Sequence, residues 1–330
     1  MRCTGRWKRL FVLLPAAALI LTGCKAAPVV SEFETNVYNR NMYEGHLYAE
    51  DLCVSSTDVA MDGFYGDSSL HAEALFDVDD GQVAYGYHLH DRLYPASTTK
   101  ILTALVAIER CSMDEIVTIG RSAAAASFDI EAQVCGLQEG DRLSMEALLS
   151  GLLLHSGNDN AVAIAEYVGG SIEGFADMMN EKARKLHATN THFVTPNGLH
   201  NDDHYTTAYD LYLIFNECIR HEEFLNIIRS SYYTADITGA DGSMRQITWY
   251  PTSYYARGEA ELPYGASIVG GKTGYTGEAG NCLILLDEDE TGKSYISIVM
   301  GADSKPLMYE DMSALINQIP GITSSETVTE

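Results

Sequence analysis

The most informative stretch of this chain is YPASTTK, residues 94–100. Lys100 follows Ser97 by three positions, and the apolar run ILTALVAI over residues 101–108 predicts a helix. Residues three apart lie on one face of a helix, so the serine hydroxyl and the lysine amine should meet there. A serine becomes a good nucleophile only when a base removes its proton, and a neutral lysine can be that base. The stretch therefore predicts a nucleophilic Ser97 that Lys100 activates.

Two more motifs strengthen this prediction, because a lone Ser-x-x-Lys occurs about once by chance in a chain of ordinary composition and this length. The motif SGN covers residues 156–158, and KTG covers residues 272–274. Each occurs once, and they follow the serine-lysine motif in that order. The ordered triple resembles the one used by penicillin-binding proteins and class A β-lactamases.

Residues 71–319 resemble the low-molecular-weight penicillin-binding proteins, which are D-alanyl-D-alanine carboxypeptidases. The resemblance implies an α+β fold of the β-lactamase/transpeptidase type. It also implies a serine peptidase that removes the terminal D-alanine from peptidoglycan stem pentapeptides and binds penicillin. The matching segments are YPASTTK at 94–100, HSGND at 155–159, GKTGYT at 271–276, TPNGL at 195–199 and HYTTA at 204–208.

The order of the expected elements agrees with that fold. Strands are predicted toward both ends of the chain and helices between them, which favours one antiparallel sheet built from both chain ends with an inserted helical lobe. The expected strands cover residues 72–78, 82–88, 232–237, 244–250, 266–272, 282–287 and 295–300. The expected helices of the lobe and the C-terminal end cover residues 145–154, 160–168, 172–186, 207–219 and 308–319.

The resemblance implies a role for each catalytic residue. Ser97 attacks the carbonyl of the penultimate D-alanine, the terminal D-alanine leaves, and water hydrolyses the acyl-enzyme. Ser156 relays a proton to the leaving amine, and Asn158 orients Lys100 and binds the substrate backbone. A lysine in water has a pKa of about 10.4, so a neutral Lys100 needs a shift of roughly three units. Burial and the nearby charge of Lys272 would both lower the pKa of Lys100.

The third motif is expected to bind the substrate. By resemblance, Lys272 and Thr273 hold the terminal carboxylate, and the backbone N–H groups of Ser97 and Tyr275 form the oxyanion hole. Gly274 leaves room for the substrate to pair along the strand edge. The expected partners are therefore stem peptides of peptidoglycan and, as covalent inhibitors, β-lactam antibiotics.

The sequence gives no reason to expect a cofactor or a metal. It contains no Gly-x-Gly-x-x-Gly and no phosphate-binding loop. His88 and His90 alternate at a strand end, without further ligands beside them. Five cysteines follow residue 24, and their number and spacing indicate neither a zinc site nor a full disulfide framework. Cys218 and Cys282 are expected to be buried, and whether two of the others form a disulfide stays open.

The first 23 residues resemble the signal peptide of a bacterial lipoprotein. A basic start precedes an apolar stretch at 10–20 that is too short for a membrane span, and Leu-Thr-Gly-Cys follows at 21–24. Cys24 would then carry the lipid and anchor the protein to the bacterial cell membrane, outside the cytoplasm. An ordinary signal peptide that ends near a cysteine is the alternative.

The remaining chain is expected to comprise a tether and N-terminal extension at 24–70, a catalytic domain at 71–319 and a disordered tail at 320–330. Without the leader's four basic residues, 17 of the 21 remain against 46 acidic ones, a net charge of −29. That charge argues against nucleic acid as a partner and against binding anionic lipid through a basic surface. Many family members carry a further C-terminal β domain, and only 56 residues follow Gly274 here, so a form without that domain is expected.

Three other functions stay open. A class A β-lactamase would use an added glutamate in a Glu-x-x-Leu-Asn run, and the chain has EEFLN at 222–226. That run continues a helical pattern rather than an exposed loop, and the second motif has glycine where lactamases usually have aspartate. A D,D-endopeptidase would cut crosslinked stems, and a penicillin sensor or scaffold would keep the fold without turnover. The sequence also leaves open the β-lactam selectivity and the oligomeric state.

Overall fold

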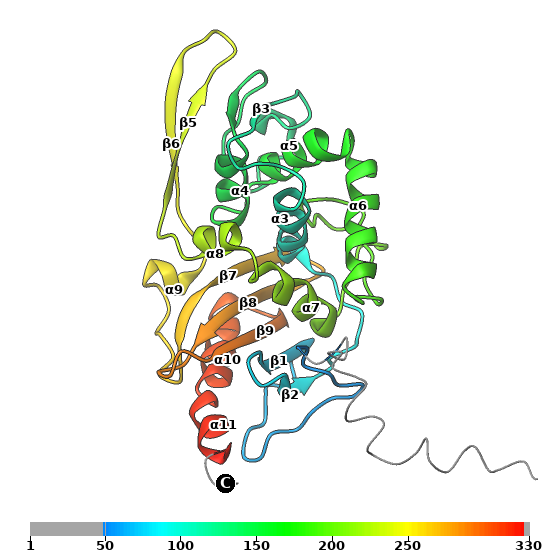
Figure 1. Ribbon diagram of the computed structural model, residues 1–330, viewed down its shortest axis with the longest axis vertical. Coiled ribbons are helices and arrows are strands. Elements are labelled where there is room, and N and C mark those ends of the chain that lie inside the picture. Colours follow the sequence, from blue (N-terminus) through cyan, green and yellow to red (C-terminus); the bar gives the residue numbers. More distant parts are fainter. Residues whose placement is uncertain (1–48, 50, 327–330) are drawn as a thin grey trace, which may run out of the picture. The chain divides into compact units, whose positions relative to one another are not determined.

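The computed structural model describes residue 49 and residues 51–326, with side chains to residue 322 (Figure 1). The expected signal peptide, Cys24 and most of the expected tether lie outside the described residues. The chain from Asp51 onward forms one unit by its internal contacts. Within the described part, no helix is long and apolar enough to cross a lipid bilayer.

The main sheet is built from both ends of the described chain, as the sequence predicts. Its strands follow the order β2-β1-β9-β8-β7, and all neighbours are antiparallel. Figure 1 shows the two N-terminal strands, in blue and cyan, in the same sheet as the orange C-terminal strands. Strand β7 lies at the edge of the sheet, so one side of its backbone is unpaired by strands. The strands are β1 (Ala72–Asp77), β2 (Gln82–Tyr87), β7 (Ser267–Thr276), β8 (Gly280–Glu288) and β9 (Ser294–Ala302).

Alternation of side chains explains how this sheet is buried on both faces. Successive side chains of a strand point to opposite faces. Leu75 and Val299 pack with α10 (Lys305–Ile316), whereas Phe76 and Ile298 belong to the core shared with the helical lobe. Full burial of one such side chain contributes about 1.5–3 kcal/mol. The apolar runs of the central strands are therefore those expected of a sheet covered by helices on both sides.

The inserted lobe is helical, and its central helix α3 (Lys100–Ile108) is buried at every position except Ile108. The four helices predicted between residues 145 and 219 begin and end within two residues of the expected positions. The lobe also contains 3₁₀ turns, one of which directly precedes α3. The remaining elements are η1 (Ala96–Thr99), η2 (Ala125–Ser127), α4 (Met145–Leu153), α5 (Asn158–Gly169), α6 (Ile172–Lys185), α7 (Ala208–Cys218), α8 (Glu222–Ile228) and α9 (Tyr254–Arg257).

A second sheet corrects the expectation that all strands join the main one. Its order is β3-β4-β5-β6, and the long β5–β6 hairpin belongs to it (Figure 1). Residues of the hairpin alternate between buried Ala235 and Ile237 and exposed Thr234 and Asp236. A strand of that kind suits a sheet with one solvated face rather than the buried centre of the main sheet. The strands are β3 (Ile116–Thr118), β4 (Arg142–Ser144), β5 (Tyr233–Thr238) and β6 (Met244–Trp249).

The C-terminal end differs from the disordered tail expected at 320–330. Helix α10 ends at Ile316, and a second helix, α11 (Ile319–Glu326), follows it. Ile319 is fully buried and Ile322 packs against the same apolar cluster as α10. Apolar residues three positions apart form one helical face, and their burial accounts for the additional helix.

The sequence left open the role of residues 46–70, and the described part of this segment packs beside α7 and β2. Cys53 is fully buried, its N–H donates to the Tyr212 hydroxyl over 2.8 Å, and its carbonyl accepts from the Tyr209 hydroxyl over 2.9 Å. Val59 pairs with Gly86 of β2. The segment therefore extends the fold on the side of the sheet away from β7.

Candidate active site

Ser97 lies on the 3₁₀ turn η1 and directly follows Ala96, whose backbone is strained. The turn has three residues per repeat, so Ser97 and Lys100 still share a face, although the α-helix begins only at Lys100. Ala96 has a φ of +49°, a region that L-residues rarely adopt. Gly198, with a φ of +81°, fits against this turn: a Cβ there would lie 1.9 Å from the Ala96 carbonyl oxygen. The turn that presents Ser97 is thus held by a close backbone contact.

Lys100 is completely buried beneath Ser97. Its Nζ lies 2.8 Å from each of three oxygens, which are Ser97 Oγ, Asn158 Oδ1 and the Asn197 carbonyl oxygen. Burial first, and the positive charge of Lys272 second, hold the pKa of Lys100 well below its usual value. A neutral amine has two hydrogens for Asn158 and Asn197, and its lone pair can accept the proton of Ser97. The geometry is that of a base and its nucleophile.

The second and third motifs meet through Lys272. Its Nζ donates to Ser156 Oγ over 2.9 Å and to the Thr273 carbonyl oxygen over 2.8 Å. Ser156 has a φ of +63°, and Asn158 begins α5 two residues later. Burial lowers the pKa of Lys272 to about 7. The second motif therefore links the other two, because its Asn158 accepts from Lys100 and its Ser156 accepts from Lys272.

Strand β7 brings the third motif against the nucleophile turn. A Cβ at Gly274 would lie 3.0 Å from both the Pro95 carbonyl oxygen and the Ser97 nitrogen, so a side chain here would force the nucleophile turn to shift. The Thr273 hydroxyl lies 2.6 Å from the Thr252 hydroxyl. Tyr275 is 62% exposed. Because β7 is an edge strand, its unpaired side can accept an extended peptide.

These elements enclose a cleft of about 300 Å³ around Ser97. Six of the eight predicted catalytic and binding residues line it, and the two lysines lie beneath its floor. Sequence reasoning missed Asn197, whose carbonyl accepts from Lys100, because a loop carbonyl has no sequence signature. It also missed several side chains of the cleft wall. Those are Glu131, Gln133, Thr252, Tyr254, Lys305, Met308 and Tyr309.

The family described as D-alanyl-D-alanine carboxypeptidase, peptidase S11, matches residues 66–304. The chain belongs to this family. It is 34% identical over 257 residues to the D-alanyl-D-alanine carboxypeptidase DacD of Escherichia coli, covering 75% of this chain and 62% of that protein. It is 32% identical over 238 residues to DacF of Bacillus subtilis, covering 70% and 57%. The chain thus spans about three fifths of the length of these curated relatives.

Solved structures of family members share the fold. The Streptomyces K15 DD-transpeptidase superimposes with a TM-score of 0.71 at 28% identity, over 80% of this chain and all of that one. Penicillin-binding protein 6B of E. coli gives a TM-score of 0.67 at 30% identity, over 80% of this chain and 81% of that one. The β-lactamase/transpeptidase-like fold expected from the motifs is therefore confirmed.

The EEFLN run of this carboxypeptidase family member is helical, as the sequence predicts. It forms α8, and Glu222 and Glu223 are both exposed on it. Neither glutamate lines the cleft around Ser97. The run therefore lacks the position that a deacylating glutamate of a β-lactamase would need.

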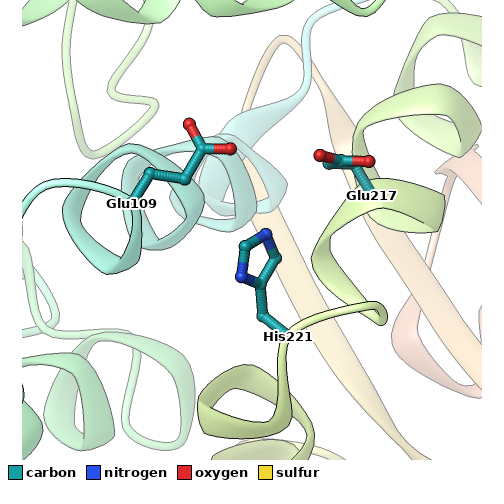
Figure 2. Close-up of side chains that lie close together, drawn as sticks. All are labelled: Glu109, Glu217 and His221. Carbon is teal, nitrogen blue, oxygen red and sulfur yellow. The ribbon is translucent and has the colours of Figure 1, made fainter.

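One group of side chains has the composition of a metal site, but the ammonium of a lysine already pairs with its carboxylates. Glu109 just after α3, Glu217 on α7 and His221 just before α8 point toward one another, with ligand atoms within 4.8 Å (Figure 2). The Lys182 ammonium lies 2.5 Å from the Glu109 carboxylate and 3.4 Å from that of Glu217. An ammonium between two carboxylates makes this group an ion-pair network.

The two histidines considered as ligands bond the backbone instead. His88 Nδ1 lies 3.1 Å from the His71 carbonyl oxygen, and His90 Nε2 lies 3.0 Å from that of Ser55. Their rings fix the loops next to β2.

The five cysteines of the described chain are all free thiols, which answers the open question of a disulfide. Cys218 and Cys282 are fully buried, as predicted.

Proposed function

We propose that the protein is a serine-type D-Ala-D-Ala carboxypeptidase that removes the terminal D-alanine from peptidoglycan stem pentapeptides through an acyl-enzyme on Ser97. The observation that carries the proposal is the buried Lys100 amine, 2.8 Å from Ser97 Oγ and with a lowered pKa. Such an amine is neutral in a larger fraction of molecules at neutral pH than an exposed lysine, and only the neutral form can take a proton. Membership of the carboxypeptidase family supports the choice of substrate.

In the first half-reaction, Ser97 Oγ attacks the carbonyl carbon of the penultimate D-alanine while Lys100 takes its proton. The peptide C–N bond then breaks, and the leaving amine receives a proton through Ser156, which is hydrogen-bonded to Lys272. Water hydrolyses the ester in the second half-reaction and restores the Ser97 hydroxyl. A β-lactam would acylate Ser97 in the same way, with its ring amide in place of the peptide bond.

The substrate would lie extended along the free edge of β7. Gly274 permits the close approach of β7 to the Ser97 nitrogen, whose N–H would form the oxyanion hole with that of Tyr275. Loss of one such donor typically costs about 10²–10³ in rate. The terminal carboxylate would bind at Thr273 and the Lys272 ammonium, and this anion would in turn favour the protonated form of Lys272.

Release of D-alanine tests the proposal against its alternatives. The full chain, kept in detergent, should release D-alanine steadily from a stem pentapeptide, and the Ser97→Ala variant should release none and bind no fluorescent penicillin. Faster cleavage of a crosslinked dimer of stems than of the pentapeptide would instead indicate an endopeptidase. Penicillin labelling of Ser97 without any release would indicate a sensor or scaffold.

We also propose that the protein acts outside the cytoplasm and is held at the membrane by lipid on Cys24. The support is the basic start, the short apolar stretch and the Leu-Thr-Gly-Cys sequence of residues 1–24. An enzyme outside the cytoplasm has access to the stem peptides of peptidoglycan. Several acyl chains on one cysteine would anchor a protein firmly, whereas its acidic surface would not attract anionic headgroups.

A further inference from the structure

Two charged side chains line the cleft around Ser97 in the described part of the chain, and their charges are opposite. Glu131 lies on the loop before the second motif, and Lys305 lies at the start of α10. The Glu131 side chain is exposed. Among the described residues, no lysine, arginine or histidine nitrogen lies within 4 Å of its carboxylate. Glu131 therefore presents to the cleft a carboxylate that forms no ion pair with a described residue, and the Lys305 ammonium does not come within 4 Å of it.

The loop that carries Glu131 is fixed by a buried carboxylate. Asp159, in the first turn of α5, is fully buried and accepts backbone N–H groups from three consecutive residues of the loop. The donors are Cys135 at 2.8 Å, Gly136 at 2.9 Å and Leu137 at 3.1 Å. A carboxylate that receives several N–H bonds in a buried site holds them strongly.

The same loop is tied to the second motif at further points. The Asn158 N–H donates to the Gln133 carbonyl oxygen over 2.8 Å, and Gln133 Nε2 lies 2.9 Å from His155 Nε2. The Trp249 indole N–H donates to the Cys135 carbonyl oxygen over 3.2 Å. Glu131 is therefore two residues before Gln133, whose carbonyl oxygen accepts from the Asn158 N–H of the second motif. The backbone that carries Glu131 therefore loses little freedom when a ligand binds.

The negative charge of Glu131 in the cleft indicates which part of the substrate it could bind. With the penultimate D-alanine at Ser97 and the stem extended along β7, the preceding stem residue lies about 3.3 Å further along, and its side chain points to the opposite side from the D-alanine methyl group. In peptidoglycan stems that residue is a diamino acid, and its side-chain amine is positively charged until a crosslink acylates it.

We propose that Glu131 binds the side-chain ammonium of the stem residue that precedes the two D-alanines. The inference rests on the carboxypeptidase function proposed above and deepens it. An acylated amine has no charge, so Glu131 makes the cleft prefer stems whose amine is not crosslinked. It is a specificity-determining residue, and it takes no part in the proton transfers at Ser97.

A pair of substrates that differ only in this charge provides the test. One is Nα-acetyl-L-Lys-D-Ala-D-Ala and the other is Nα,Nε-diacetyl-L-Lys-D-Ala-D-Ala, and D-alanine release gives kcat/KM for each. The wild-type full chain should prefer the free amine by about threefold at low salt, the size expected of a partly exposed ion pair. High salt should reduce the preference.

Variants assign the preference to one residue. Glu131→Gln should bring the ratio of the two kcat/KM values to about one. Glu139→Gln is the matched control, because Glu139 follows on the same loop, pairs with Arg121 and does not line the cleft. It should keep the wild-type ratio. The midpoint of thermal unfolding of each variant checks that it is folded.

Different outcomes contradict the inference and the proposed function. A wild-type enzyme without preference for the free amine, or a Glu131→Gln variant that keeps the wild-type ratio, would overturn the inference. Absence of D-alanine release by the wild type from both substrates would instead contradict the proposed carboxypeptidase function.

Discussion

At the scale of single residues, burial gives the two lysines beneath the cleft their chemistry. Lys100 has a strongly lowered pKa because it is buried and because Lys272 is nearby. Burial alone lowers the pKa of Lys272 to about 7. Two ammonium groups so close in a buried site disfavour each other, so we expect the working state to have Lys100 neutral and Lys272 charged. The expectation that Lys100 needs a large downward shift agrees with this structure in direction and cause.

The rate of turnover should therefore depend on pH through both lysines. Below the pKa of Lys100 the base is protonated, so kcat/KM falls toward acid pH. Above about pH 7 the free enzyme loses the Lys272 ammonium, so kcat/KM for a substrate with a terminal carboxylate falls toward alkaline pH. A peptide with a terminal carboxamide should lack the alkaline decline, because it does not use that charge. Equal alkaline limbs for the two substrates would contradict the assignment.

At the level of helices and strands, the spacing of apolar residues predicted those elements that bury one face. The lobe helices and the central strands were confirmed because each has a buried face visible in its own sequence. The β5–β6 hairpin was predicted as strands but assigned to the wrong sheet, since its pairing with β4 joins Arg142 and Thr238, which are 96 positions apart in the sequence. Ser97 was expected to share a helical face with Lys100, and it lies instead on the 3₁₀ turn before α3.

The contact between Gly198 and η1 should be essential to the active turn. Gly198→Ala places a Cβ 1.9 Å from the Ala96 carbonyl oxygen at a φ of +81°. We expect it to lower the free energy of unfolding by about 2–4 kcal/mol and acylation by penicillin at least roughly tenfold. Gly170→Ala is the control, with a φ of +74° and no atom within 4 Å of its Cβ. If both variants acylate equally well, the contact does not position Ser97.

The helix α8 should not take part in deacylation. Glu222→Gln removes the charge of an exposed helical residue outside the cleft. The breakdown rate of the penicilloyl enzyme, followed after removal of excess fluorescent penicillin, should stay within about twofold of the wild type, as for surface substitutions in general. Glu223→Gln serves as the matched variant. A slowing of tenfold or more in Glu222→Gln alone would revive the β-lactamase interpretation.

At the scale of the whole molecule, the cleft exists because distant parts of the chain close on one another. Ser97 comes from the turn before α3, Asn158 from α5, and Gly274 from the last third of the chain, where β7 packs on η1. The sequence predicted these residues through their motifs. It did not predict the wall residues Glu131 and Lys305, because a single charge on a loop or helix end becomes part of a site only through the fold.

Membrane attachment is the property of the whole chain that depends on residues outside the described structure. If Cys24 carries the lipid, Cys24→Ala should leave the protein either released from the membrane or retained as an unprocessed precursor. Cys3→Ala is the control, because it changes a cysteine of the same leader without touching the expected cleavage site. Removal of residues 327–330, which keeps α11, should leave attachment unchanged. Fractionation of membranes, together with the size of each product, measures the outcome. A processed Cys24→Ala protein that stays in the membrane fraction would show that something other than this lipid holds it there.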